Sequence, residues 1–193
     1  MEDRKLTEKE SLELISQMLR ETRENIQNYV AYPFLIWGYL TVIVSVIVWY
    51  VWSETGNPQW NGLWFALPAI GWPLNKMIGG KADKGTTTYM DRVIENIWIV
   101  IGVVVLMVGA ASCLLEDVLF IIALLLSIGA TLTGWVIKFK PMGWAGAASV
   151  LLSFGLLFVP GINQLLVFAI LFVIMMIIPG HIFYNHVMRC SKI

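Results

Sequence analysis

The chain has 193 residues, of which 58% are hydrophobic and only 13% carry a charge, and its formal net charge at pH 7 is zero. Soluble domains average about 25% charged residues, so this composition excludes an ordinary soluble protein. The balanced charge also provides no strongly basic surface, and we expect no nucleic-acid partner.

The first 29 residues are the polar part of the chain and are predicted to form an amphipathic helix. Thr7 and Glu10 have the spacing of a capping box, which predicts that the helix begins near Glu8. Apolar positions then recur at alternating intervals of three and four residues, which is the pattern of a heptad seam. We predict an interaction seam made of Leu12, Ile15, Leu19, Ile26 and Tyr29.

Three interpretations of this helix compete. It could lie on the membrane, pair with a second copy, or dock on a partner protein or on the chain's own cytoplasmic loops. Residues 1–28 hold five basic and seven acidic side chains. Helices that lie on a membrane surface are usually rich in Lys and Arg, so this acidic balance favours contact with protein.

Six apolar runs follow, each about long enough to cross the hydrocarbon core of a bilayer as a helix. They do not alternate as the strands of a membrane β-barrel would. The predicted fold is therefore an all-α, polytopic membrane helical bundle, with residues 1–29 as a cytoplasmic helix and residues 30–193 as the membrane domain. The predicted spans are 33–52, 62–78, 93–115, 117–137, 141–160 and 162–180.

The basic residues predict the orientation of these spans. All 13 Lys and Arg residues lie in the N-terminal segment, the second and fourth loops, or the C-terminal tail. The other three loops hold only Glu54, Glu116 and Asp117 as charged residues. The positive-inside rule then predicts that both termini are cytoplasmic.

The second run is unusual because it contains Pro68 and Pro73. A proline inside a helix lacks an N–H donor and leaves a backbone carbonyl without its helical partner. Broken helices in membranes often line cavities, so these residues mark a helix break or a possible cavity. The alternative is an ordinary kink.

Small residues predict where the spans pack closely. Ala123, Ser127, Ala130 and Gly134 form a stripe on the fourth run. Similar residues occur on the fifth run, beginning at Gly143, and the third run has Gly102 and Gly109. We expect these three helices to form the packed centre. The sixth run has few small residues and is predicted to be peripheral.

Groups for catalysis or metal binding are scarce in this chain. His181 and His186 are five residues apart and would not share a helix face, and Cys113 and Cys190 are expected at opposite faces of the membrane. No paired carboxylates occur inside the spans. We therefore expect no enzymatic activity, no metal and no cofactor.

The block LTEKESLELISQM, from Leu6 to Met18, and the layout of the spans resemble a group of small multi-span membrane proteins of Bacteroidetes bacteria. The resemblance implies a bacterial inner membrane and supplies no activity or catalytic residue.

The expected function is that of a non-catalytic inner-membrane protein. It would act through self-association or a protein partner, by way of its cytoplasmic helix, within membrane lipid. The alternative is a channel or permease for a neutral or apolar small solute, lined by the second run.

Overall fold

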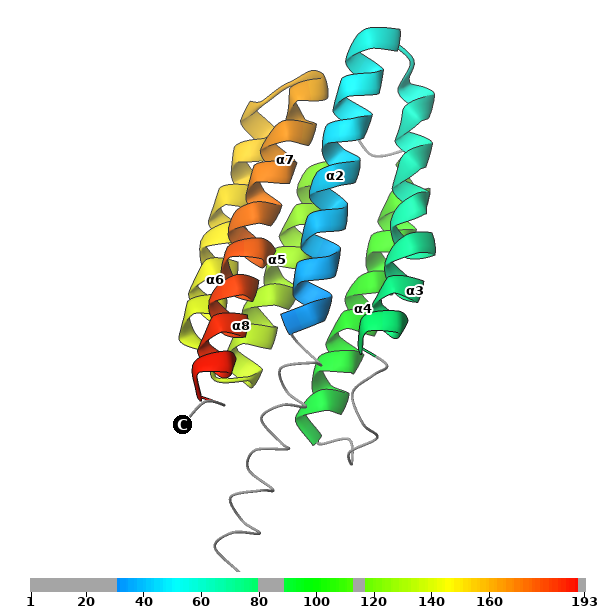
Figure 1. The fold of residues 1–193 in the computed structure, drawn as a ribbon. Helices are drawn as coiled ribbons and strands as arrows, with labels where there is room; N and C mark the ends of the chain where they lie inside the picture. The colour runs from blue at the N-terminus through cyan, green and yellow to red at the C-terminus, as the bar shows by residue number, and fades with distance from the viewer. Residues whose placement is uncertain (1–30, 80–88, 113–116, 191–193) are drawn as a thin grey trace, which may run out of the picture.

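The computed structural model describes residues 31–79, 89–112 and 117–190, and within these ranges every regular element is a helix (Figure 1). The predicted interaction seam lies outside the described residues. The elements, in chain order, are α2 (Tyr32–Thr55), the 3₁₀ helix η2 (Pro58–Phe65), α3 (Ala66–Gly79), α4 (Tyr89–Ala110), α5 (Val118–Val136), α6 (Lys140–Ser153), the 3₁₀ helices η3 (Phe154–Phe158) and η4 (Gly161–Asn163), α7 (Gln164–Phe172), the π turn η5 (Val173–Ile177) and α8 (Ile178–Cys190).

Five of the described segments are long and apolar enough to cross a membrane, which confirms the predicted all-helical membrane class. They agree closely with five of the six predicted spans. Their ranges are Tyr32–Thr55, Asp91–Ala110, Val118–Val136, Lys140–Phe158 and Gly161–His186.

The predicted second span, residues 62–78, is not among these five. It forms part of η2 followed by α3, and α3 has only 14 residues. At 1.5 Å per residue, α3 is about 21 Å long, which is shorter than the hydrocarbon core. Pro68 cannot donate to the carbonyl of Trp64, and a proline costs least in the first turn of an α-helix, which is where it lies because α3 begins at Ala66.

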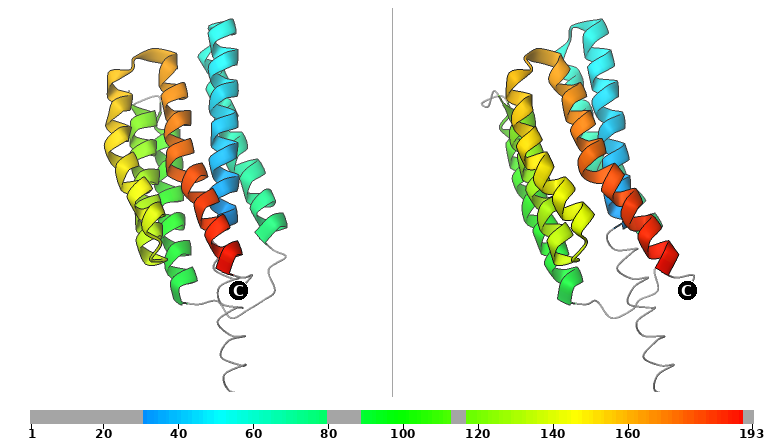
Figure 2. Two further views of the ribbon diagram at one scale, coloured as in Figure 1. Left: turned by 60° about the vertical axis from the view of Figure 1, so that its left-hand side comes forward. Right: turned by 90° about the vertical axis from the view of Figure 1, so that its left-hand side faces the viewer.

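The helices run side by side along one long axis (Figures 1 and 2). After a turn at Gly56, which has a left-handed φ of 63°, η2 and α3 return antiparallel to α2. On its other side α2 packs against α7 and η5. Helix α5 packs against both α4 and α6.

The small-residue prediction is confirmed for α5 and α6. All four stripe residues on α5 are buried, and a β-carbon added at Gly134 would lie 2.6 Å from the α-carbon of Gly143. Lys138, with a left-handed φ of 55°, forms the turn between the two helices, and the Phe139 N–H donates to the Gly134 carbonyl at 2.9 Å. The backbones of α5 and α6 are therefore in direct contact.

The same prediction is wrong for the third span, α4. Gly102 and Gly109 have open space where a β-carbon would be, so no helix packs on them among the described residues. Instead, Ile101 of α4 fits against Gly129 of α5. The contact uses a small residue on α5, and α4 presents most of its surface outward.

The prediction that the sixth span is peripheral is also wrong. Phe168, Phe172 and Met175 are at most 1% exposed and form the centre of the core. These large side chains fill space that small residues on other helices leave open. Gly38 of α2, for example, faces Met176 and Ile177.

A π turn interrupts the sixth span at Val173–Ile177. Pro179 has no N–H to donate to the Met175 carbonyl four residues earlier. The N–H of Ile178 donates to Val173, five residues back, and this wider turn lets the helix continue past the proline.

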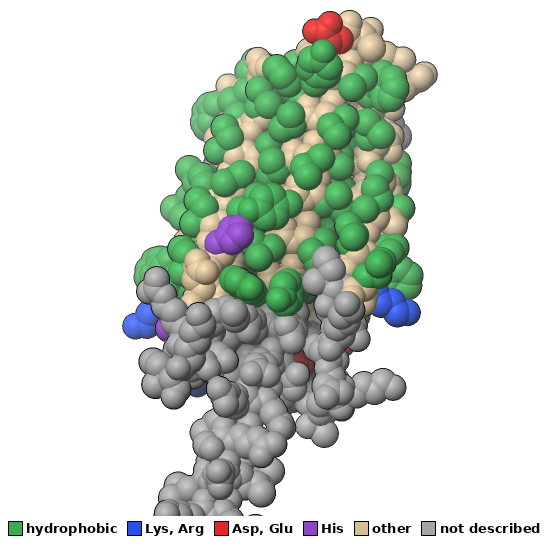
Figure 3. Space-filling view, in the orientation of Figure 1, with side chains coloured by type: hydrophobic (Ala, Val, Ile, Leu, Met, Phe, Trp, Pro, Cys, Tyr) green, Lys and Arg blue, Asp and Glu red, His purple; other side chains and the backbone are tan. Residues whose placement is uncertain are grey.

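Charged side chains occupy the two ends of the bundle, and hydrophobic side chains cover the face between them in Figure 3. At one end are Lys76 near the end of α3, Arg92 near the start of α4, and Lys138 and Lys140, in the turn after α5 and at the first residue of α6. Glu54, near the end of α2, lies at the opposite end.

Candidate functional site

The two prolines predicted to mark a break lie in an element that remains helical. Pro68 is in the first turn of α3, and Pro73 lies inside α3, which continues to Gly79. Gly71, between them, packs against Trp37 of α2, where an added β-carbon would lie 2.8 Å from the ring. Close packing on α2 therefore occurs in the part of α3 that carries the two prolines.

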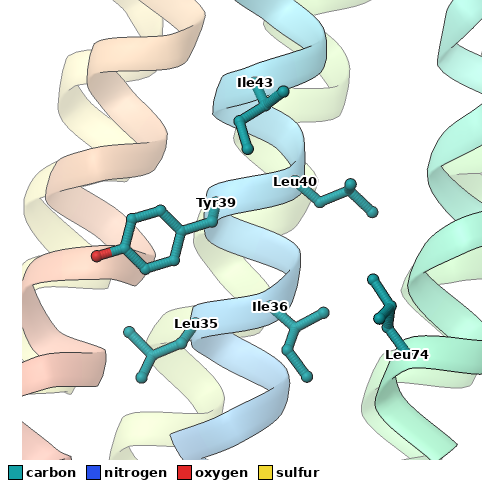
Figure 4. Close-up of a pocket in the computed structure, with 6 residues that line it drawn as sticks. All are labelled: Leu35, Ile36, Tyr39, Leu40, Ile43 and Leu74. Atoms are coloured by element: carbon teal, nitrogen blue, oxygen red, sulfur yellow. The ribbon is translucent and has the colours of Figure 1, made fainter. Parts of the chain in front are cut away.

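A shallow groove lies beside this part of α3, on the surface of α2 (Figure 4). It has a volume of about 310 Å³ and opens to the outside of the bundle. Apart from one phenol hydroxyl, the side chains that line it are aliphatic. They are Leu35, Ile36, Tyr39, Leu40 and Ile43 of α2, and Leu74 of α3.

Tyr39 connects this groove to α8. Its ring extends from α2 away from Leu74, as Figure 4 shows, and its hydroxyl is 2.7 Å from Nε2 of His181. The two rings also make an edge contact at 5.9 Å between centroids. Tyr39 is 45% exposed and His181 is exposed too, so this polar pair lies on the outer surface of the bundle.

The second histidine has different surroundings. The His186 ring is 5.8 Å from the Phe139 ring, which belongs to the turn between α5 and α6. Within residues 31–79, 89–112 and 117–190, no group of three His, Cys, Asp or Glu side chains could hold a metal ion.

Most buried hydroxyl groups are hydrogen-bonded within their own helices. Ser45, Thr131 and Ser149 each donate to the carbonyl four residues earlier, at 2.7–2.8 Å. Such bonds satisfy a polar side chain in an apolar bundle without involving another helix. Each of these hydroxyls bonds to a backbone carbonyl and not to a side chain that could act as a base, so none resembles an activated nucleophile.

Among the described residues, three buried or partly buried side-chain hydrogen bonds connect different elements, and one of them runs from the Gln164 Nε2–H of α7 to the Leu156 carbonyl of η3 at 3.2 Å. The other two connect longer helical segments. The Trp98 Nε1–H of α4 donates to Oγ1 of Thr133 on α5 at 3.1 Å. The Ser127 hydroxyl of α5 donates to the sulfur of Met175 in η5 at 3.3 Å. Both contacts help to fix how the helices are oriented, and neither forms a reactive group.

Sequence reasoning treated His181 as one of two unrelated histidines near the end of a span and did not connect it with Tyr39. The two residues are 142 positions apart, so no local spacing signals their contact. The predicted sixth span ended at residue 180, whereas the apolar helical segment continues to His186, so His181 lies inside it. An ionisable residue inside an apolar span is a candidate functional residue by default.

Comparisons with protein-family models, with curated proteins and with solved structures found no match for this chain.

Proposed function

We propose that this chain is a non-catalytic integral protein of a bacterial inner membrane. In this proposal it acts by self-association, or by binding another membrane protein, through its cytoplasmic N-terminal helix. The observation that carries the proposal is the capped heptad pattern of residues 7–29, which carries a net negative charge and precedes an apolar bundle. An apolar seam of the predicted kind needs a protein surface to cover it.

The proposed topology has six spans, with η2 and α3 together forming the second. The 3₁₀ helix η2 adds eight residues to α3 and, at about 2.0 Å per residue, adds enough length for the pair to cross the bilayer. Both termini are then cytoplasmic, together with the basic end of the bundle. The resemblance of residues 6–18 to the Bacteroidetes group supports the same membrane.

The interior of the described bundle supports a non-catalytic role. Its buried hydroxyls mostly bond to carbonyls of their own helices, and the groove beside α3 is lined by aliphatic side chains. Neither arrangement combines a nucleophile with a base.

The direct test is to change Leu12, Ile15 and Leu19 to Ser together in the full chain. We expect the oligomer that the wild type forms to dissociate, measured by native mass spectrometry in detergent and by cross-linking in native membranes. The matched control changes Glu13, Gln17 and Glu24 to Ser, because these positions lie off the seam of the same helix. Unchanged assembly in the seam variant would refute the proposal.

A second candidate is a permease for a neutral or apolar solute. The observation that favours it is the aliphatic groove next to Pro73, at the side of α3. A permease should carry such a solute into proteoliposomes, and changing Leu74 to Trp should block the uptake. The assembly proposal predicts that liposomes with the protein and liposomes without it take up the solute equally.

A further inference from the structure

We infer that Tyr39, His181 and the adjoining groove bind the headgroup and tail of a prenylquinone. This site is independent of the proposed association through the N-terminal helix. The arrangement at this site is unusual, because an ionisable side chain and a phenol are exposed together on an apolar, outward-facing surface.

The neighbours of the pair place it within the hydrocarbon region of the proposed membrane domain. Ile178 and Ile182, on either side of His181 in α8, are 49% and 45% exposed. On α2, Ile43 lies one turn beyond Tyr39 and is also exposed. The two side chains satisfy each other in part, so in lipid the cost falls on any donor that their mutual hydrogen bond leaves unused.

The hydrogen bond between the two side chains leaves one donor unused in either tautomer. If the Tyr39 hydroxyl donates to Nε2, the His181 proton is on Nδ1 and has no acceptor among the described residues; if Nε2–H donates, the phenol proton has none. Within the described residues, this is the one hydrogen bond of each side chain. The pair therefore offers a donor to an acceptor that enters from the lipid.

The lining of the groove indicates which kind of molecule would bring the hydrogen-bond acceptor to the pair. It is continuous with Tyr39 and is otherwise aliphatic, so it suits an apolar chain. None of its lining residues is a cation, which disfavours a phospholipid phosphate. A prenylquinone is neutral, carries carbonyl acceptors on a flat ring, and has an apolar tail, so it fits both the pair and the groove.

The test uses the full chain in phosphatidylcholine nanodiscs with a photoreactive azidoquinone that has a short apolar tail. We expect saturable labelling of the peptides around Tyr39 and His181, and competition by unlabelled decylubiquinone. Changing Tyr39 to Phe or His181 to Phe should weaken the competition by about tenfold, the effect of losing one good hydrogen bond. His186 to Phe is the matched control, since it makes the same change on the same helix.

A second variant separates binding from folding. Changing Ile43 to Trp fills the groove and leaves both polar groups in place, and it should also prevent labelling. Each variant is compared with the wild type by its thermal midpoint. Labelling that does not saturate, or that is equal in the wild type and all folded variants, would overturn the inference. A decrease in labelling as the amount of nanodisc phospholipid rises would also overturn the inference, because the site would then hold a phospholipid.

Discussion

Gly146 of α6 lies so close to Thr131 of α5 that a β-carbon added at position 146 would be 2.5 Å from the Thr131 backbone nitrogen. Real β-carbons do not approach backbone atoms this closely, so the two helices can touch here only because residue 146 has no side chain.

We therefore expect the change of Gly146 to Ala to destabilise the bundle, although Ala is the better helix former by about 1 kcal/mol. Overpacking costs about 1–3 kcal/mol, and here the neighbouring atoms are backbone, which cannot move aside easily. The thermal midpoint in detergent should fall. Gly102 to Ala on α4 is the control, because its β-carbon meets open space and the change should leave the midpoint unchanged or higher.

The contrast between these glycines shows what the sequence could predict. The apolar runs predicted the helices because lipid requires each segment to satisfy its own backbone. A small residue shows that a close contact is possible, and it does not show whether another helix comes to that face. Gly134 and Gly102 look alike in the sequence, but only Gly134 faces a neighbouring backbone.

The core position of the sixth span leads to a second prediction. Changing Phe168 to Ala should lower the stability by about 3–5 kcal/mol, because Phe168 is 1% exposed and its removal leaves a cavity. Phe158 is 84% exposed, so the same change there tests the loss of a ring without a cavity. Equal midpoints for the two variants, measured by thermal unfolding in the same detergent, would contradict the observed core.

The contact between Trp98 and Thr133 leads to a third prediction. Changing Thr133 to Val keeps the shape of a fully buried side chain but removes the acceptor for the Trp98 indole. Hydrogen bonds between membrane helices contribute about 0.6 kcal/mol on average, so we expect a coupling of about 0.5–1.5 kcal/mol. A double-mutant cycle with Trp98 to Phe measures this coupling.

Thr131 to Val is the comparison for that cycle, since its hydroxyl bonds only to the Ser127 carbonyl of its own helix. It should show no coupling to Trp98 to Phe. Additive effects of the Thr133 and Trp98 changes would mean that the 3.1 Å contact does not stabilise the bundle.

The polar contacts were beyond sequence reasoning for a physical reason. Trp98 and Thr133, or Tyr39 and His181, meet because whole helices pack in one particular order, and that order depends on how all the side chains fill space. The prolines of α3 could be seen in the sequence, but the sequence did not show that α3 stays helical through Pro73 or that Gly71 lies against Trp37 of α2. The predicted seam at residues 12–29 stays a prediction.

The proposed orientation can be tested at residues that the structure describes. With Cys113 and Cys190 both changed to Ser, single cysteines are placed at Glu54 and at Lys138, which lie at opposite ends of the bundle. In intact cells whose outer membrane has been permeabilised, a membrane-impermeant maleimide should label position 54 and leave position 138 unlabelled. The positive-inside rule requires this result, because Lys138 belongs to the basic end.

Position 76 distinguishes the six-span proposal from five spans, because it tests which side of the membrane the end of α3 faces, and position 60 serves as the outer-side reference at the start of η2. Trp60 is 40% exposed and follows the turn at Gly56, so a cysteine there should be labelled as readily as one at position 54. A cysteine at Lys76 should behave like Lys138, protected in intact cells and labelled after lysis, because η2 and α3 have then crossed the bilayer between them. Labelling at position 76 in intact cells would leave only five crossings, and would place the end of α3 on the outer side.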